Sequence, residues 1–219
     1  MFRLDNQSSR YGNREVLSNL TLSITRGEKV ALVGESGAGK TTLLRLLRAQ
    51  QEGDIAWCPQ EHGLVLPLSV FHNVFMGQLD RHSSLYNLRN LMLPVRDEVV
   101  AVEKLLHNLG MGEWLWSSVD KLSGGQQQRV AVARALFSAR CTFLGDEPVS
   151  AVDEYQGRAI LDLVMKRHET VVLALHDIEL ALACCSRIIG LQEGKIVLDA
   201  PAAELSPQAL APLYRHHHG

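Results

Sequence analysis

A glycine-rich segment near the N-terminus carries residues suited to hold a polyphosphate. Residues 34–41 read Gly-Glu-Ser-Gly-Ala-Gly-Lys-Thr, which fits the pattern G-x-x-x-x-G-K-[ST] at every fixed position. Glycines let such a loop turn several backbone N–H groups toward one anion, and the helix that follows adds its positive end. Lys40 would reach the β- and γ-phosphates, and the Thr41 hydroxyl would bind Mg²⁺. The predicted nucleoside triphosphate site comprises Gly34, Glu35, Ser36, Gly37, Ala38, Gly39, Lys40, Thr41 and Thr42.

A second glycine-containing segment precedes a helix rich in Ala and Val. Residues 122–129 read Leu-Ser-Gly-Gly-Gln-Gln-Gln-Arg. Ser123 suits a helix N-cap, and the two glycines after it leave backbone amides open, so the segment predicts a second anion site. From these residues alone, the alternative is a capped helix without a ligand.

Two adjacent carboxylates stand at the end of a predicted apolar strand. Asp146 and Glu147 follow residues 141–145, Cys-Thr-Phe-Leu-Gly. Successive side chains of a strand point to opposite faces, so one carboxylate can face a metal ion while the other faces a nucleophile. Solvated carboxylates are the alternative. A phosphate loop alone also fits a kinase, a GTPase or a recombinase, so the other segments must decide between classes.

Together these segments resemble the ABC ATPase family, whose LSGGQ signature residues 122–126 reproduce in full. The resemblance runs from about residue 2 to residue 205. It implies a Walker B strand in which Asp146 holds Mg²⁺ through water and Glu147 is the general base, with Lys40 also serving catalysis. It further implies that Gln60 contacts Mg²⁺ and the attacking water, that His176 contacts the γ-phosphate and that Tyr11 stacks on adenine. Asp153 would belong to a D-loop in which Val152 replaces the usual Leu. The signature residues expected at the nucleotide are Ser123, Gly124, Gly125 and Gln126.

The resemblance also implies an assembly. In the family, two chains bind head to tail and hold two ATP molecules, each between the phosphate loop of one chain and the signature of the other. We therefore expect a homodimer with ATP and Mg²⁺, working on the inner face of the cell membrane beside integral permease subunits. An extracytoplasmic solute-binding protein is expected in the same system. Nucleic acid is not expected as a partner, because the formal charge is -2 and no basic tract is present.

The residues after Gln60 favour solute import. Residues 64–74 and 77–79 are importer-like, and residues 83–94 together with 122–136 and 146–153 look most like phosphonate-import ATPases. Two alternatives stay open: the ATPase of an export or lipoprotein-releasing system, and a soluble non-transport ABC protein. Proteins of the latter kind usually carry two motor halves or a long coiled-coil insertion, which these residues lack.

The order of elements predicts an α/β fold, a P-loop NTPase domain over residues 1–215 with a tail at 216–219. Residues 1–65 and 140–205 form a core with a mostly parallel sheet and a small N-terminal antiparallel subdomain, and residues 66–139 form a mainly helical subdomain that carries the signature. Predicted strands cover 28–33, 141–145, 170–175, 187–191 and 195–199, and predicted helices cover 40–50, 97–109, 126–138, 155–168 and 178–185.

The N-terminal part and the middle of the chain depart from that regular alternation. Residues 2–24 are expected as two antiparallel strands with a turn at 11–13. The stretch between Pro67 and Pro94 is expected to be less regular. Only residues 49–55 separate the phosphate-loop helix from the strand before Gln60, so the antiparallel subdomain should be trimmed and the adenine edge more open.

Composition bounds the remaining possibilities. The hydrophobic fraction is 46%, yet no apolar run approaches the roughly 20 residues that cross a bilayer. Residues 1–10 lack the apolar core of a signal peptide, so we expect a cytosolic chain. The four cysteines are expected to be reduced and buried, and residues 216–218 are expected to be a disordered tail or tag remnant.

Overall fold

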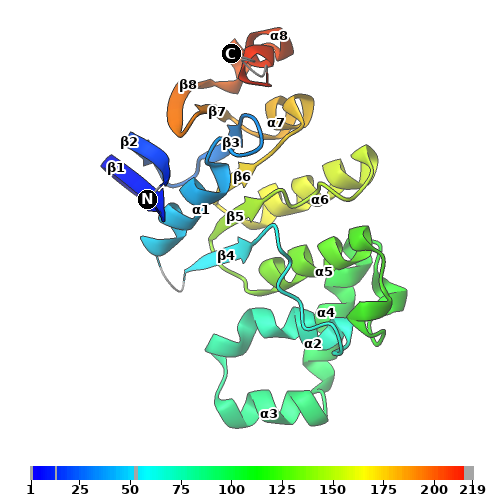
Figure 1. The fold of residues 1–219 in the computed structure, drawn as a ribbon. Coiled ribbons are helices and arrows are strands. Elements are labelled where there is room, and N and C mark those ends of the chain that lie inside the picture. Colours follow the sequence, from blue (N-terminus) through cyan, green and yellow to red (C-terminus); the bar gives the residue numbers. More distant parts are fainter. Residues whose placement is uncertain (1, 13, 52–53, 215–219) are drawn as a thin grey trace.

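The computed structural model describes residues 2–12, 14–51 and 54–214, without the side chains of Tyr11 and Arg14. Its centre is a six-stranded sheet in the order β4-β5-β6-β3-β7-β8 (Figure 1). The first five strands of that order run parallel, and the last is antiparallel to its neighbour. The strands are β3 (Lys29–Val33), β4 (Ile55–Cys58), β5 (Thr142–Asp146), β6 (Thr170–Ala174), β7 (Arg187–Gln192) and β8 (Lys195–Pro201).

The two central strands β5 and β6 are buried at every position, and most of their residues are apolar, as in parallel strands covered by helices. In β3, Val30 and Leu32 pack with the leucines of α1 (Lys40–Ala49) and with the N-terminal strands. Ala31 and Val33 point to the other face, where they join the core under α5 (Gly124–Phe137), α6 (Glu154–Arg167) and α7 (Ile178–Cys184). The predicted α/β fold with a mostly parallel sheet is thereby confirmed.

The N-terminal strands form a separate two-stranded antiparallel sheet, β1 (Phe2–Tyr11) and β2 (Arg14–Ile24). The two antiparallel strands expected in this region are therefore observed. The side chain of Gln50 closes the edge of β1: its Nε2 donates to Arg3 O at 2.6 Å, and its Oε1 accepts from Arg3 N at 3.0 Å. One amide side chain thus satisfies the backbone pair that a further strand would take.

The region between β4 and β5 is helical and more regular than the sequence predicted. It contains α2 (Val70–Phe75), α3 (Ser84–Met92), α4 (Arg96–Asn108) and α5, with a 3-10 turn at Met76–Arg81 (Figure 1). The expectation of an irregular stretch between Pro67 and Pro94 was wrong, because Ser69 and Ser83 cap two short helices there. The fully buried Asn73 holds the preceding loop through Val65, whose N donates to its Oδ1 at 2.8 Å.

Two further expectations concern side-chain environment and the C-terminal part. Cys58 and Cys185 are buried, but Cys184 is half-buried and Cys141 is exposed, so the expectation that all four are buried was wrong. After β8 the chain adds α8 (Pro207–Leu210) and a 3-10 turn (Ala211–Tyr214), which the sequence did not indicate. The expected tail lies outside the described residues. No helix within the described ranges is both long and apolar enough to cross a bilayer.

Candidate nucleotide-binding site

The predicted functional residues gather at one edge of the sheet. The phosphate loop follows β3, Gln60 follows β4, Glu147 follows β5 and His176 follows β6. The carboxyl ends of parallel strands meet at the same edge, and ligands of open α/β sheets bind in the crevice outside them. The topology therefore brings together four segments that lie far apart in the sequence.

The phosphate loop has a shape that only glycine can supply at two of its positions. Gly34 has φ 142° and Gly39 has φ 107°. A Cβ atom would lie 2.2 Å from Leu191 O at Gly34 and 2.5 Å from Leu17 Cδ2 at Gly39. Gly37 also has positive φ but faces open space. The N-terminus of α1 has no side-chain cap, so its first amides remain for an anion.

Lys40 lies buried at the centre of this loop. Its Nζ donates to the carbonyl oxygens of Gly34 at 2.7 Å and Glu35 at 2.9 Å. Burial lowers the pKa of Lys40, and the nearby carboxylates of Glu147 and Asp146 partly offset that effect. The loop is also held from the C-terminal part of the chain.

That contact is made by Tyr214, whose hydroxyl oxygen accepts from Gly34 N at 3.3 Å. The same hydroxyl donates to Leu175 O at 3.5 Å. Burial raises the pKa of Tyr214, so the phenol stays neutral and keeps its proton for this contact.

A pocket of about 180 Å³ brings the predicted residues of three loops together. It is lined by residues of the phosphate loop and α1, by Gln60, which was expected at the attacking water, and by Glu147, the expected general base. Its lining comprises Val16, Ser36, Gly37, Gly39, Lys40, Thr41, Thr42, Gln60 and Glu147. The predicted adenine contact, Tyr11, ends β1, and its side chain lies outside the described residues.

The adjacent carboxylates differ sharply in environment. Asp146 is 1% exposed, and neither carboxylate oxygen has a hydrogen-bond partner within bonding geometry. Burial raises the pKa of Asp146, while the nearby Thr41 hydroxyl opposes the shift. Glu147 reaches the pocket and lies beside His176, with 2.5 Å between its Oε1 and His176 Nε2. Its backbone is left-handed, with φ 53°, which is costly for a residue with a side chain.

The signature segment is built as a closed cap. Ser123 Oγ accepts from Gln126 N at 3.3 Å, and Gln126 Oε1 accepts from Ser123 N at 2.8 Å. Ser123 and Gly124 are exposed, and none of residues 123–126 is among those lining the phosphate-loop pocket. Asp153 caps α6 through Gln156 N at 2.9 Å and lines a cavity of about 360 Å³ with Glu147 and His176.

Sequence reasoning missed two side chains of α5 that contact these loops. Gln128 bonds to the backbone beside Glu147, with 2.7 Å between its Nε2 and Glu147 O. Arg134 donates through Nη1 to Gly63 O at 2.7 Å and through Nη2 to His62 O, in the loop that follows Gln60. No sequence pattern distinguishes either residue from a solvated polar residue of an amphipathic helix, so neither could have been assigned beforehand.

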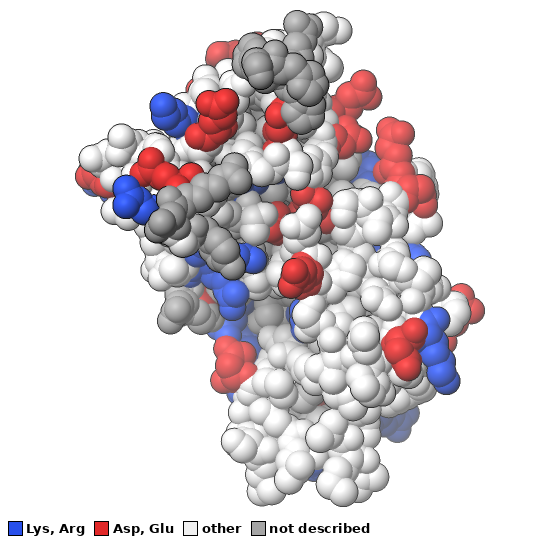
Figure 2. Space-filling view, viewed as in Figure 1, with Lys and Arg blue, Asp and Glu red and all other residues white. Residues whose placement is uncertain are grey.

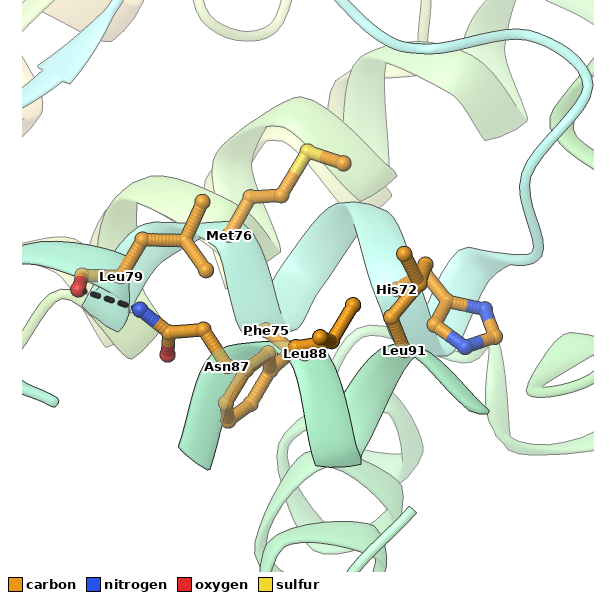
Figure 3. Close-up of a pocket in the computed structure, with 7 residues that line it drawn as sticks. All are labelled: His72, Phe75, Met76, Leu79, Asn87, Leu88 and Leu91. Carbon is orange, nitrogen blue, oxygen red and sulfur yellow. Dashed lines mark hydrogen bonds between the residues drawn. The ribbon is translucent and has the colours of Figure 1, made fainter. Parts of the chain in front are cut away.

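A separate apolar pocket of about 270 Å³ lies between α2 and α3 (Figure 3). In Figure 3 the side chain of Asn87 turns aside to donate to Leu79 O, at 2.8 Å, which leaves hydrocarbon on the pocket walls. The lining residues are His72, Phe75, Met76, Leu79, Asn87, Leu88 and Leu91.

A glycine loop before a helix, a carboxylate pair on a parallel strand and a histidine at the next strand define a P-loop nucleoside triphosphatase. A family model described as ABC transporter matches residues 17–150, and the chain belongs to this family. It is therefore an ATP-binding cassette that hydrolyses ATP. The suspected ABC ATPase resemblance is confirmed.

Named relatives and solved cassettes match over nearly the whole chain. "Phosphonates import ATP-binding protein PhnC" of Rhizobium johnstonii is 33% identical, covering 98% of this chain and 86% of the relative. The protein named "Phosphonates import ATP-binding protein PhnC 1" of Natronomonas pharaonis is 36% identical, covering 98% and 99%. A bacterial ABC transporter cassette solved as a dimer has a TM-score of 0.76 at 26% identity, covering 92% and 99%. A dimeric post-hydrolysis cassette bound to ADP and Pi has a TM-score of 0.71 at 25% identity, covering 91% and 98%.

Proposed function

We propose that the chain is the ATPase subunit of an importer for phosphonates or related phosphorus compounds. The observation that supports hydrolysis is the pairing of His176 with Glu147, which itself lines the phosphate-loop pocket. The observation that supports import is the length of the match to relatives named for phosphonate import, which extends over 98% of the chain.

In this proposal the phosphate loop and Lys40 bind the β- and γ-phosphates. Lys40 then exchanges its bonds to loop carbonyls for charge-assisted bonds to phosphate, which are stronger. Glu147 takes the proton from the attacking water as general base, a role that contributes about 10²–10⁴-fold. His176 orients Glu147 before ATP arrives and contacts the γ-phosphate afterwards. Gln60, which lines the same pocket, orients the water.

Asp146, Thr41 and Gln60 would hold Mg²⁺. The fit is supported by the two buried oxygens of Asp146 that lack hydrogen bonds, since a buried carboxylate needs a compensating partner. The bound ion would neutralise charge on the phosphates.

We further propose a head-to-tail homodimer in which Ser123 and Gly125 of one chain donate to the γ-phosphate held by the other. The exposure of Ser123 and Gly124, apart from the phosphate-loop pocket, supports this arrangement. A 26%-identical cassette solved as a dimer supports it too. Asp153, Gly124 and Gln126 would lie at the same interface, and Tyr11 would stack on adenine at an edge left open by the two-stranded sheet.

The permease would dock on the helical part of this single domain, residues 66–139 of 1–215. The apolar pocket between α2 and α3 supports this proposal, as do Leu85, Met92 and Leu93, which are 77%, 75% and 73% exposed. Figure 2 shows that the surface at this lower end of the molecule is almost free of charged side chains. Large exposed apolar patches mark interaction sites. The chain would then lie on the cytoplasmic face of the membrane, with an extracytoplasmic binding protein delivering solute.

The test compares wild type with Glu147→Gln. We expect the variant to bind ATP, to dimerise in its presence and to release phosphate about 10²–10⁴-fold more slowly. Wild-type phosphate release by the variant would remove Glu147 from the base role. Import is tested by co-purification with a permease and by phosphonate-stimulated hydrolysis of the reconstituted complex, and absence of both would reject the transport assignment.

A further inference from the structure

The side-chain amide of Gln128 makes three hydrogen bonds, and all three are to the loop that carries Glu147. Gln128 is 3% exposed and lies on α5, five residues after Ser123. Its Nε2 donates to Glu147 O at 2.7 Å and to Ser150 Oγ at 3.0 Å, and its Oε1 accepts from Ala151 N at 2.7 Å. Both ends of the 147–151 loop are therefore fastened to one side chain.

The fastened loop is strained at the residue whose carboxylate is expected to act as base. Glu147 has φ 53°, and such a conformation persists only where its surroundings impose it. Its N donates to Ala174 O at 3.1 Å, which fixes the residue to β6, while Gln128 fixes its carbonyl. Loss of either anchor would free the backbone of Glu147 to relax, and its carboxylate would then no longer be held beside His176.

The same helix begins at the signature, so Gln128 connects two functional segments. Gly125 sits so close to this loop that a Cβ there would lie 2.5 Å from Ala151 O. The signature and the 147–151 loop, called the base loop below, are thus in contact through the close approach of Gly125 to Ala151 and through the buried amide of Gln128. Any displacement of α5 would therefore reach the Glu147 carbonyl through the Gln128 amide.

We infer that Gln128 is a positioning residue that couples the orientation of Glu147 to the position of the signature helix. The inference rests on the proposed roles of Glu147 and Ser123. Its ordinary alternative is a buried polar residue that only stabilises the fold. The two differ in what is lost: coupling affects turnover, whereas a stabilising role affects the melting temperature.

The neighbouring Gln127 provides a matched control. Its Nε2 donates to Val119 O and Leu122 O, both at 3.2 Å, within the helical region and away from the base loop. Gln127→Met and Gln128→Met each remove hydrogen bonds from one glutamine of the same helix, with a side chain of similar length.

The experiment measures ATP turnover, ATP-dependent dimerisation and melting temperature for both variants. For Gln128→Met we expect kcat to fall about 10- to 100-fold, because a misplacement near 1 Å costs that much, with KM for ATP within about threefold and dimerisation retained. For Gln127→Met we expect kcat within about twofold of wild type. A Gln128→Met variant with wild-type kcat, or equal losses of kcat in both variants, would overturn the inference.

Gln128→Glu serves if Gln128→Met does not fold. It keeps an acceptor for Ala151 N but loses the donor to Glu147 O, so we expect the same loss of kcat with normal ATP binding. Wild-type turnover by a folded Gln128→Glu overturns the inference. Glu147→Gln is measured in parallel: an active Glu147→Gln rejects the base assignment, whereas an inactive Glu147→Gln with fully active Gln128 variants rejects only the coupling.

Discussion

Two glycine segments, each before a helix, are prepared for an anion in opposite ways. The phosphate loop leaves the N-terminus of α1 uncapped and occupies its own centre with Lys40. The signature closes the N-terminus of α5 with a reciprocal cap between Ser123 and Gln126. The first segment bends through left-handed glycines packed on the backbone and side chains of neighbouring segments, and at Gly124 the second meets only open space.

The difference shows which site is complete in one chain. The phosphate loop needs only ATP to satisfy its amides, so it is preformed. The signature has already satisfied the Ser123 amide and hydroxyl internally, and these bonds must be exchanged if a phosphate arrives. In the proposed dimer, contact between ATP and the signature would therefore gain less free energy per hydrogen bond, and the phosphate would come from a second chain.

The largest effect is expected from a substitution in the phosphate loop. Lys40→Ala removes the only side-chain cation placed within the described phosphate-loop pocket, so ATP binding and turnover should fall by about 10³-fold or more. Binding of a fluorescent ATP analogue and phosphate release measure this. Retained high-affinity binding would show that the backbone amides suffice without the ammonium.

The signature should fail differently. Ser123→Ala should leave ATP binding by the single chain within about twofold and should lower turnover by about 10²-fold, the usual cost of one lost donor to a reacting group. Light scattering in the Glu147→Gln background should show weaker ATP-dependent dimerisation. An equal loss of monomer binding would contradict the separation of the two sites.

The glycines give a contrast in stability. Gly34→Ala places a Cβ 2.2 Å from Leu191 O in a left-handed conformation, so unfolding free energy should fall by about 1–3 kcal/mol or more. In Gly124→Ala the new Cβ has no atom within 4 Å, so the free energy of unfolding should change by less than about 0.5 kcal/mol. Urea titration of both variants without nucleotide checks the pair. Equal destabilisation would show that the signature is as constrained as the phosphate loop.

The smallest effect concerns the cap itself. Gln126→Ala removes one of the two reciprocal bonds, so stability should fall by about 0.5–1 kcal/mol. Because the Ser123 amide is then free, ATP-dependent dimerisation should not weaken by the same amount. A loss of dimer larger than the loss of stability would mean that Gln126 contributes to the proposed interface more through its expected contact with the nucleotide than through the cap.

The elements that the sequence predicted best have strict local rules. The phosphate loop was predictable because its glycine spacing allows few backbone paths, and the sheet was predictable because β5 and β6 are buried at every position. Helix α3 was missed because the prolines at 67 and 94 indicated an irregular stretch, although leucines at 85, 88 and 91 recur at helical spacing; these leucines are exposed in the structure. Burial of Cys141 was wrongly expected, since residue type does not reveal whether the residue just before a buried strand is covered.

The candidate site shows a similar division. Motif residues lie on loops whose order in the sequence identifies them, and the structure places Lys40, Gln60 and Glu147 in one pocket. Gln128 and Arg134 depend on which loops approach α5 in space. That information comes from packing between distant segments, and it appears in no local pattern.

The Tyr214 hydroxyl joins the C-terminal turn to the phosphate loop. Its oxygen bridges Gly34 N, the first amide of the phosphate loop, and the carbonyl oxygen of Leu175 just before His176, so a residue that no motif includes contacts two segments of the proposed nucleotide site. An environment-sensitive dye beside this turn would therefore sense nucleotide arrival without touching a catalytic group. Conversely, a clamp on residues 211–214 would slow the enzyme from outside.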